Sequence, residues 1–244
     1  MKIKTLLLSD IHLGTKDSKT EEILSLLETI EFEKLILVGD IVDGWALSRG
    51  SKLKKNHTKL IRKFLKLSEK KIEIIWLRGN HDDFLKDIIP YSIGNIHIKE
   101  DYVLKTKNGK EYYTFHGDAF DVFVTKMGWV AKIGSIGYDI ALWLNRWYNR
   151  YRKWRGKPYF SLSKKIKNSV KKATNFINSF EDVISDMAKQ KGYDGVICGH
   201  IHHPEDKVIN GVHYINCGDW VENLTYVIED YDGNLTVHSF IKKT

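Results

Sequence analysis

Residues 3–14 read IKTLLLSDIHLG and join an uninterrupted apolar run to two polar side chains suited to metal binding. The run Ile3–Leu8 has the length and composition of a buried β-strand. Asp10 and His12 follow where that strand is expected to end. A buried strand that carries a carboxylate and an imidazole just past its carboxyl end is typical of an α/β protein whose site lies at the edge of its sheet.

Strand-like and helical patterns alternate beyond this stretch, as in an α/β layered sheet. Strands are expected at 35–38, 72–77, 112–115, 195–198 and 212–217, with a hairpin of 224–228 and 235–241 around Asp232-Gly233. One amphipathic helix, capped by Asp17 or Ser18, is expected to carry Ile23, Leu26, Leu27 and Ile30, and a second to carry Leu60, Ile61, Phe64, Leu65 and Leu67. The pattern predicts one α/β core.

Polar clusters follow five of these expected strands, so residues far apart in the sequence can converge at one sheet edge. The candidate metal ligands are Asp10, His12, Asp40, Asn80, His116, His200 and His202. They offer carboxylate oxygens, imidazole nitrogens and an amide oxygen, but no thiolate. Such a mixed set suits Mn²⁺, Fe or Zn²⁺ better than a calcium cage or a structural zinc site.

Seven ligands exceed a single shell that must also hold water and substrate, which favours two divalent ions. A carboxylate has to bridge them, and we assign that position to Asp40. Two such ions activate a water molecule and clamp phosphoryl oxygens. The predicted chemistry is hydrolysis of a phosphate ester or anhydride.

The composition is that of one catalytic domain with an insertion. The 244 residues are 42% hydrophobic, enough for a sizeable core. Cys198 and Cys217 lie in apolar runs without zinc-type spacing, so we expect buried cysteines in a reducing compartment. The run Leu6–Leu8 is too short for a signal peptide, and no run reaches membrane-spanning length. We expect a cytoplasmic protein, or one docked on a membrane from that side.

The strand pattern stops between Ala119 and Phe180, where long helical candidates rich in Trp and Tyr replace it. Residues 140–180 contain eleven Lys or Arg and no acid, so the rest of the chain has a net charge of −3 out of the total of +8. We expect residues 119–180 to form a helical cap inserted between core segments 1–118 and 181–244. The cap either faces anionic lipid or is a helical hairpin with its own aromatic core and solvated lysines.

The ordered polar blocks resemble those of the calcineurin-like metallophosphoesterases. The blocks are Asp10-Ile11-His12, Gly39-Asp40-Ile41-Val42-Asp43, Gly79-Asn80-His81-Asp82, His116-Gly117 and Gly199-His200-Ile201-His202. The resemblance implies an α/β fold of αββα type, a β-sandwich flanked by helices. It also implies one metal held by Asp10, His12, Asp40 and His202, and another held by Asp40, Asn80, His116 and His200.

The same resemblance implies roles for residues that do not bind metal. His81 would stand at the open face and stabilise the transition state or protonate the leaving oxygen. Asp82 would orient His81. Asp43 would support the metal ligands from behind.

A closer resemblance, over nearly the whole length, is to the UDP-2,3-diacylglucosamine hydrolases of lipid A synthesis. It rests on Gly44-Trp45, His116-Gly117-Asp118, residues 158–163 (PYFSLS) and residues 216–222 (NCGDWVE). It implies release of UMP and a lipid monophosphate, with Mn²⁺, at the cytoplasmic face of the inner membrane. The best-known branch has Arg in place of His81, so a related nucleotide-linked lipid stays open as the substrate.

Candidate substrate contacts lie in or beside the expected cap. Helical spacing puts Lys164, Asn168 and Lys171 near one face, where they could bind a diphosphate, and Asp121 could contact the sugar. Solvation is the alternative for all four. A nuclease or nucleotide phosphodiesterase, and a non-enzymatic scaffold, are the rival functions. The oligomeric state is left open.

Overall fold

The structure is a computed structural model that describes residues 1–120 and 162–241, without the side chains of 162–173. The chain divides into two compact units, Met1–Asp118 with Ile184–Thr244, and Ala119–Val183. All seven predicted metal ligands belong to the first unit. Within the described residues, no helix is both long and apolar enough to cross a bilayer.

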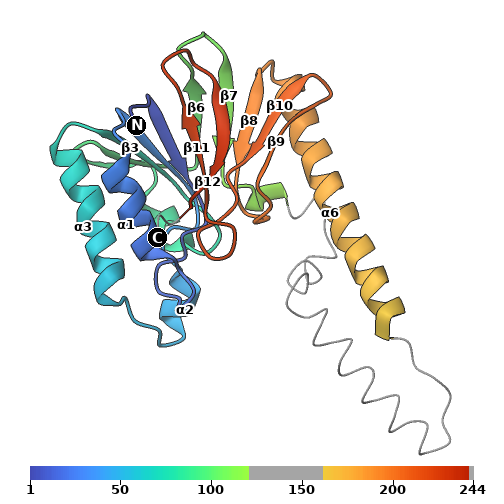
Figure 1. Cartoon of the computed structure of the whole chain (residues 1–244), viewed down its shortest axis with the longest axis horizontal. Coiled ribbons are helices and arrows are strands. Elements are labelled where there is room, and N and C mark those ends of the chain that lie inside the picture. Colours follow the sequence, from blue (N-terminus) through green and yellow to red (C-terminus); the bar gives the residue numbers. More distant parts are fainter. Residues whose placement is uncertain (121–161, 242–244) are drawn as a thin grey trace, which may run out of the picture. The chain divides into compact units, whose positions relative to one another are not determined.

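Two β-sheets form the centre of the first unit (Figure 1). The seven-stranded sheet has the order β12-β11-β1-β2-β3-β5-β4, with β1 Thr5–Leu8, β2 Lys34–Val38, β3 Glu73–Leu77, β4 Tyr91–Ile93, β5 Ile96–Lys99, β11 Thr225–Glu229 and β12 Leu235–Ser239. The five-stranded sheet has the order β6-β7-β8-β10-β9, with β6 Asp101–Lys105, β7 Glu111–Phe115, β8 Gly195–Cys198, β9 Glu205–Ile209 and β10 Val212–Asn216. Each sheet has parallel strands at its centre and antiparallel pairs at its margins.

Strand β1 shows why the apolar run is continuous: both of its faces are buried. Leu6 and Leu8 pack in a core with residues of the helices, whereas Leu7 packs in a second core shared by the two sheets. Ile36 and Ile197, from one sheet each, belong to that second core. The predicted sandwich of two sheets is confirmed.

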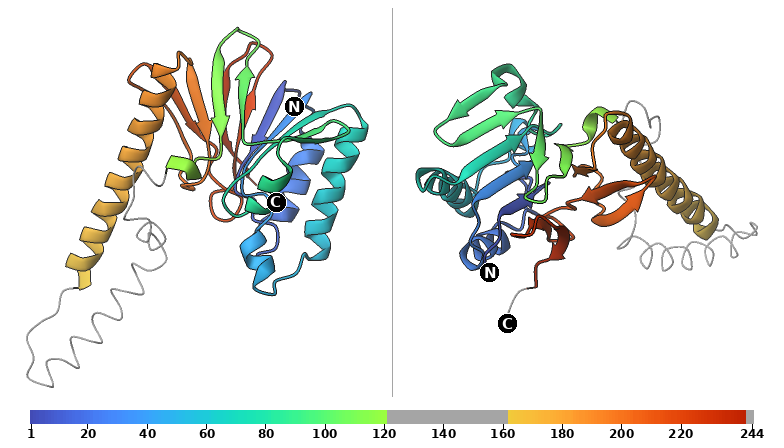
Figure 2. Two further views of the ribbon diagram at one scale, coloured as in Figure 1. Left: turned by 180° about the vertical axis from the view of Figure 1, so that it is seen from behind. Right: turned by 90° about the horizontal axis from the view of Figure 1, so that it is seen from above.

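Helices cover the outer face of the seven-stranded sheet, as both views of Figure 2 show. They are α1 Thr20–Thr29 and α3 Lys55–Glu69, preceded by the short α2 Gly44–Ser48. The other helical elements of the described residues are η1 Asp83–Ile88, η2 Asp118–Phe120 and α6 Leu162–Gln190. The end of α6 contributes buried Ile184 and Ala188 to the first unit.

The structure corrects two details of the predicted elements. The helix expected after Asp17 or Ser18 has Lys19 at its N-cap and no side-chain cap. Strands β4, β5, β6 and β9 were not predicted. The predicted hairpin near the C-terminus is confirmed, because β11 and β12 pair antiparallel.

Candidate metal centre

The backbone at the ends of β1, β2 and β8 adopts a conformation that L-residues rarely take. Eight non-glycine residues have positive φ in the described part of the chain, and five of them are predicted metal ligands: Asp10 (52°), His12 (51°), Asp40 (55°), His200 (68°) and His202 (52°). Each such residue costs of order 1–3 kcal/mol and persists only where its surroundings hold it. Backbone hydrogen bonds do so here, from Asp10 N–H to the Gly39 carbonyl and from His12 N–H to the Asp40 carbonyl.

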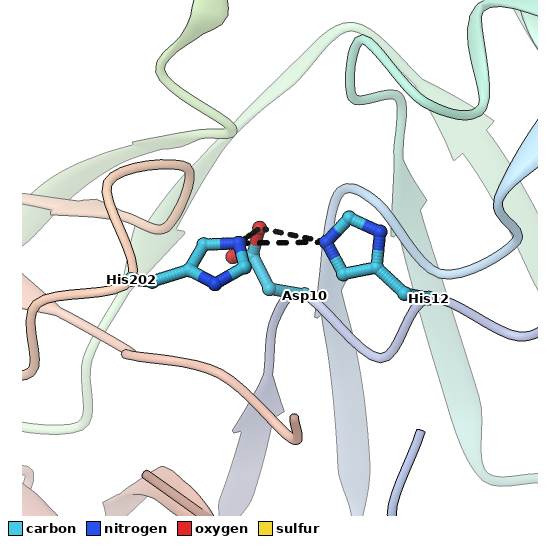
Figure 3. Close-up of side chains that lie close together, drawn as sticks. All are labelled: Asp10, His12 and His202. Atoms are coloured by element: carbon cyan, nitrogen blue, oxygen red, sulfur yellow. Dashed lines mark hydrogen bonds and ion pairs between the residues drawn. The ribbon is translucent and has the colours of Figure 1, made fainter. Parts of the chain in front are cut away.

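Asp10, His12 and His202 form the first group of converging ligands (Figure 3). Asp10 Oδ1 lies 3.1 Å from His202 Nε2 and 3.7 Å from His12 Nε2. The two imidazole nitrogens are 3.4 Å apart. Two ligands bound to one ion at about 2.0–2.2 Å are separated by roughly 3 Å or slightly more, so this spacing fits a metal.

Asp40, His116 and Asn80 form the second group. His116 Nε2 lies 3.4 Å from Asp40 Oδ2 and 3.2 Å from Asn80 Oδ1. Asp40 Oδ2 is also 3.7 Å from His12 Nε2 in the first group. One carboxylate oxygen therefore faces imidazoles of both groups, as a bridging ligand must.

His200 is placed beside the second group by its backbone and ring. Its N–H donates to Asp10 Oδ2 at 3.0 Å, and its ring centroid lies 5.1 Å from that of His116. The structure thus brings together the predicted ligands from five loops, which follow β1, β2, β3, β7 and β8.

Two glycines of the motifs are required by close packing behind the ligands. A Cβ on Gly79 would overlap the Asp40 carboxylate and meet the Asp40 backbone nitrogen at 2.5 Å. A Cβ on Gly39 would overlap the His116 ring. Real Cβ atoms do not approach other atoms this closely, so a side chain at either position would displace a ligand.

Hydrogen bonds on the far side of the imidazole rings fix which nitrogen faces the centre. His116 Nδ1 donates to the Val38 carbonyl at 3.0 Å, and His12 Nδ1 lies 3.2 Å from Asp43 Oδ2. Such partners hold the ring orientation and leave Nε2 as the metal-binding atom. The donor set and its orientation fit divalent metal ions.

His81 receives its support from Asp43, which corrects the predicted role of Asp82. Asp43 Oδ2 lies 3.0 Å from His81 Nδ1 and also contacts His12. The Asp82 carboxylate instead accepts from the N–H groups of Ile41 and Gly79 and from Trp76 Nε1. Neighbours in sequence need not be neighbours in space, and Asp82 turns back beneath the loops that follow β2 and β3.

The electrostatics of the centre depend on paired imidazoles and carboxylates. Burial alone would lower the pKa of His12 and His116, but the neighbouring carboxylates outweigh it and raise both to about 10. The imidazoles in turn hold the pKa of Asp10 and Asp40 below the usual range, against the effect of burial. Burial and the charge of Asp40 raise the pKa of Asp82 to about 6. Metal ions would replace the imidazole protons as partners of these carboxylates.

Three residues next to the ligands had no predicted role. Ser9 Oγ donates to Asp10 Oδ2. The carboxylate of buried Asp219 lies 3.9 Å from His202 Nδ1, and the side chain of Asn223 donates to the His202 carbonyl at 2.9 Å. Asp219 lies in the NCGDWVE segment, on which the resemblance partly rests. The sequence of that segment did not indicate that Asp219 lies beside His202.

The predicted substrate contacts lie outside the part of the chain whose side chains the structure describes. Asp121 is outside the described residues. Lys164, Asn168 and Lys171 belong to α6, but their side chains are outside the described part. Nothing in the structure tests these four assignments.

The fold and the donor cluster define a class: an α/β protein of two packed sheets with a metal centre of oxygen and nitrogen ligands at the strand ends. The chain belongs to the calcineurin-like phosphoesterase family, whose model matches residues 3–204. It is a metal-dependent hydrolase that acts on phosphoric ester or anhydride bonds. The predicted enzyme class is confirmed.

Among curated relatives, the chain is similar to two proteins named UDP-2,3-diacylglucosamine hydrolase. The one from Shewanella piezotolerans is 23% identical over 226 residues, which cover 90% of this chain and 91% of the relative. The one from Porphyromonas gingivalis is 30% identical over 125 residues, 48% and 47% of the two chains. Among solved structures, a hypothetical protein of Pyrococcus horikoshii is 14% identical, covers 99% of this chain and 90% of its own, and has a TM-score of 0.51. That likeness concerns the fold alone.

Proposed function

We propose that the protein cleaves the pyrophosphate of UDP-2,3-diacylglucosamine, giving UMP and 2,3-diacylglucosamine 1-phosphate, or acts on a closely related nucleotide-linked lipid. The observation that carries this proposal is similarity along nine-tenths of the chain to a UDP-2,3-diacylglucosamine hydrolase. The complete set of seven ligands supports it, because a scaffold has no physical reason to cluster these carboxylates and imidazoles. The substrate places the enzyme in lipid A synthesis, at the cytoplasmic face of the inner membrane.

Two divalent ions, Mn²⁺ in our proposal, would be held by the two ligand groups. The first would be bound by Asp10, His12, Asp40 and His202, and the second by Asp40, Asn80, His116 and His200. When bound, the ions supply an activated water and neutralise charge on the phosphoryl oxygens. The position of Asp40 Oδ2 between His12 and His116 supports its role as the shared ligand.

His81 is the protein's own acid in this proposal. Its side chain is 22% exposed, and its Nε2 lies 4.0 Å from Asp40 Oδ2, beside the cluster. Asp43 Oδ2 lies 3.0 Å from Nδ1, so we assign Nε2 as the nitrogen that donates a proton to the leaving oxygen. Trp45 covers one face of the ring at a centroid distance of 4.2 Å and limits its movement.

The cap would bind the rest of the substrate. We propose that residues 119–180 form this cap, with Lys164, Asn168 and Lys171 at the diphosphate and Asp121 at the sugar. Within the cap, residues 140–180 contain eleven Lys or Arg and no acid, which supports contact with anionic lipid. The same charge supports the rival function, a nuclease or nucleotide phosphodiesterase.

Release of UMP from the purified UDP-lipid in the presence of Mn²⁺ tests the proposal. We expect UMP and the lipid monophosphate in equal amounts, and no product from the Asp40→Ala variant. A soluble activated phosphodiester serves as a parallel substrate for the metal centre. Hydrolysis of that diester and of oligonucleotides, without UMP from the lipid, would assign the protein to the rival function.

A further inference from the structure

The connection between α2 and α3 carries an excess of positive charge on the described core, separate from residues 119–180. Residues 44–68 contain eight Lys or Arg and no acid. None of the eight forms an ion pair with a described carboxylate, whereas Lys34, Arg78 and Lys105 elsewhere on the core each do. A basic segment without acids has a net positive charge that attracts an anionic partner.

Five of these cations are exposed in the α2–α3 connection and in the first two turns of α3. Arg49, Lys52, Lys54 and Lys55 are exposed in the connection and at the start of α3, and Lys59 follows one turn along the helix. Leu53, in their midst, leaves 36% of its surface exposed. We call these six residues the α2–α3 basic surface.

A depression beside this surface adds polar groups from another loop. It has a volume of about 190 Å³ and is lined by Lys16, Ser18, Thr20, Glu21, Glu22, Lys54, Asn56 and His57. The Asn56 side chain donates to Glu21 Oε1 at 2.6 Å, and Glu21 and Glu22 keep their negative charges at the rim. The five cations of the α2–α3 basic surface and Lys16 outnumber these two acids, so six positive and two negative charges leave an excess of four positive charges.

The position of the surface relates it to the metal centre. Trp45, in α2, packs on His81, and Arg49 follows α2 directly. Figures 1 and 2 show α2 and its connection to α3 at the end of the strands opposite the β6–β7 turn. The surface and His81 thus belong to the same end of the core.

We propose that the α2–α3 basic surface docks the core on an anionic lipid bilayer, with Leu53 inserted among the headgroups. Cations around a partly exposed apolar side chain match such a bilayer by charge and by polarity. The choice of a bilayer over another polyanion rests on the proposed function, because a lipid-linked substrate is presented at a membrane. None of its residues belongs to the expected cap, so the surface adds a contact of its own.

Vesicle binding by the full chain tests the inference. The probe is vesicles of equal parts phosphatidylglycerol and phosphatidylcholine, compared with phosphatidylcholine alone. A variant with Arg49→Gln, Lys52→Gln and Lys54→Gln should partition onto the anionic vesicles roughly a hundredfold more weakly, since each cation near the surface is worth roughly fivefold. The matched control removes three exposed lysines at the opposite end, Lys105→Gln, Lys107→Gln and Lys110→Gln, and should lose less than about twofold.

Further variants separate charge from structure. Arg49→Lys, Lys52→Arg and Lys54→Arg together keep the charge and should keep binding. Leu53→Ser should reduce the binding that remains at high salt. An equal loss in the glutamine variant and its control, or no loss in either, would overturn the inference, as would weaker binding to a single-stranded oligonucleotide without weaker binding to vesicles.

The soluble phosphodiester distinguishes failure of this inference from failure of the proposed function. The glutamine variant should hydrolyse it at the wild-type rate, because none of its three residues contacts the metal centre. Selective loss of vesicle binding supports the docking surface even if the UDP-lipid gives no UMP. Release of UMP with unchanged vesicle binding leaves the proposed function intact and removes the docking surface.

Discussion

Single carboxylates contact more than one ring of the candidate metal centre. Asp40 faces His12 and His116, and Asp43 contacts His12 and His81. Asp40 therefore contacts one proposed ligand of each ion, and Asp43 contacts a proposed ligand and the proposed acid. A substitution at one of them should show which ring depends on it.

His81→Ala should keep the metals and lower turnover by roughly two to four orders of magnitude, the usual contribution of a positioned acid. Metal content and kcat are the measurements, with Asp40→Ala as the variant that loses the metals. Turnover near the normal value in His81→Ala would remove its assigned role.

Asp43→Asn should cost roughly 10–100-fold in activity, because outer partners of ligands and catalytic rings contribute about that much. At saturating Mn²⁺ the loss should remain in kcat, since His81 loses the carboxylate beside its ring. Asp82→Asn is the comparison: Asp82 contacts backbone and Trp76 instead of His81, so its kcat, measured well above its pKa of about 6, should fall less than that of Asp43→Asn. A larger loss of kcat in Asp82→Asn would restore the role first predicted for Asp82.

Gly79→Ala should weaken metal binding by a similar 10–100-fold, because its Cβ would push the Asp40 carboxylate and backbone aside. The control is Gly109→Ala, where a Cβ meets nothing within 4 Å although φ is +85°. The control should cost stability but no metal affinity. Metal titration and thermal unfolding of both variants separate the two effects.

At the scale of elements, the sequence predicted the strands that are buried on both faces, and it missed β5 and three of the four edge strands, β4, β6 and β9. β1 is apolar throughout, whereas β4 is exposed at all three positions and β9 mixes Glu, Asp and Lys with two apolar residues. Edge strands owe their place to backbone pairing with a neighbour, which leaves little trace in composition. The convergence of the candidate ligands could be predicted because all of them follow expected strands, but the contact from Asp43 to His81 depends on side-chain direction.

The core between α3 and the seven-stranded sheet corrects one predicted position, because Leu65, expected among the apolar residues of this helix, is exposed. Phe64 is 2% exposed within that core, and its neighbour Leu65 is 46% exposed. Phe64→Ala should lower the free energy of unfolding by about 3–5 kcal/mol, whereas Leu65→Ala should change it by about 0.5 kcal/mol or less. Chemical denaturation of both variants gives the comparison, and equal losses would contradict the assigned face.

For the whole molecule, metal binding should be coupled to proton release and to stability. Without metal, the carboxylates raise the pKa of His12 and His116 to about 10, so both rings are protonated at neutral pH. Imidazole binds a metal only in its neutral form. Mn²⁺ must therefore displace one proton from each ring. For each proton displaced, the affinity for Mn²⁺ should rise about tenfold per pH unit below pH 10.

The same protons set the stability of the metal-free protein. A histidine whose pKa rises on folding, here from 6.5 to about 10, contributes stability in full below 6.5 and loses it as the pH approaches 10. The metal-bound protein has no such protons to lose, so the gap in Tm between the two forms should widen from pH 6.5 upward. Calorimetric titrations with Mn²⁺ in buffers of different ionisation enthalpy count the protons released. A count of zero, with a Tm gap independent of pH, would show that His12 and His116 are neutral before the metal arrives.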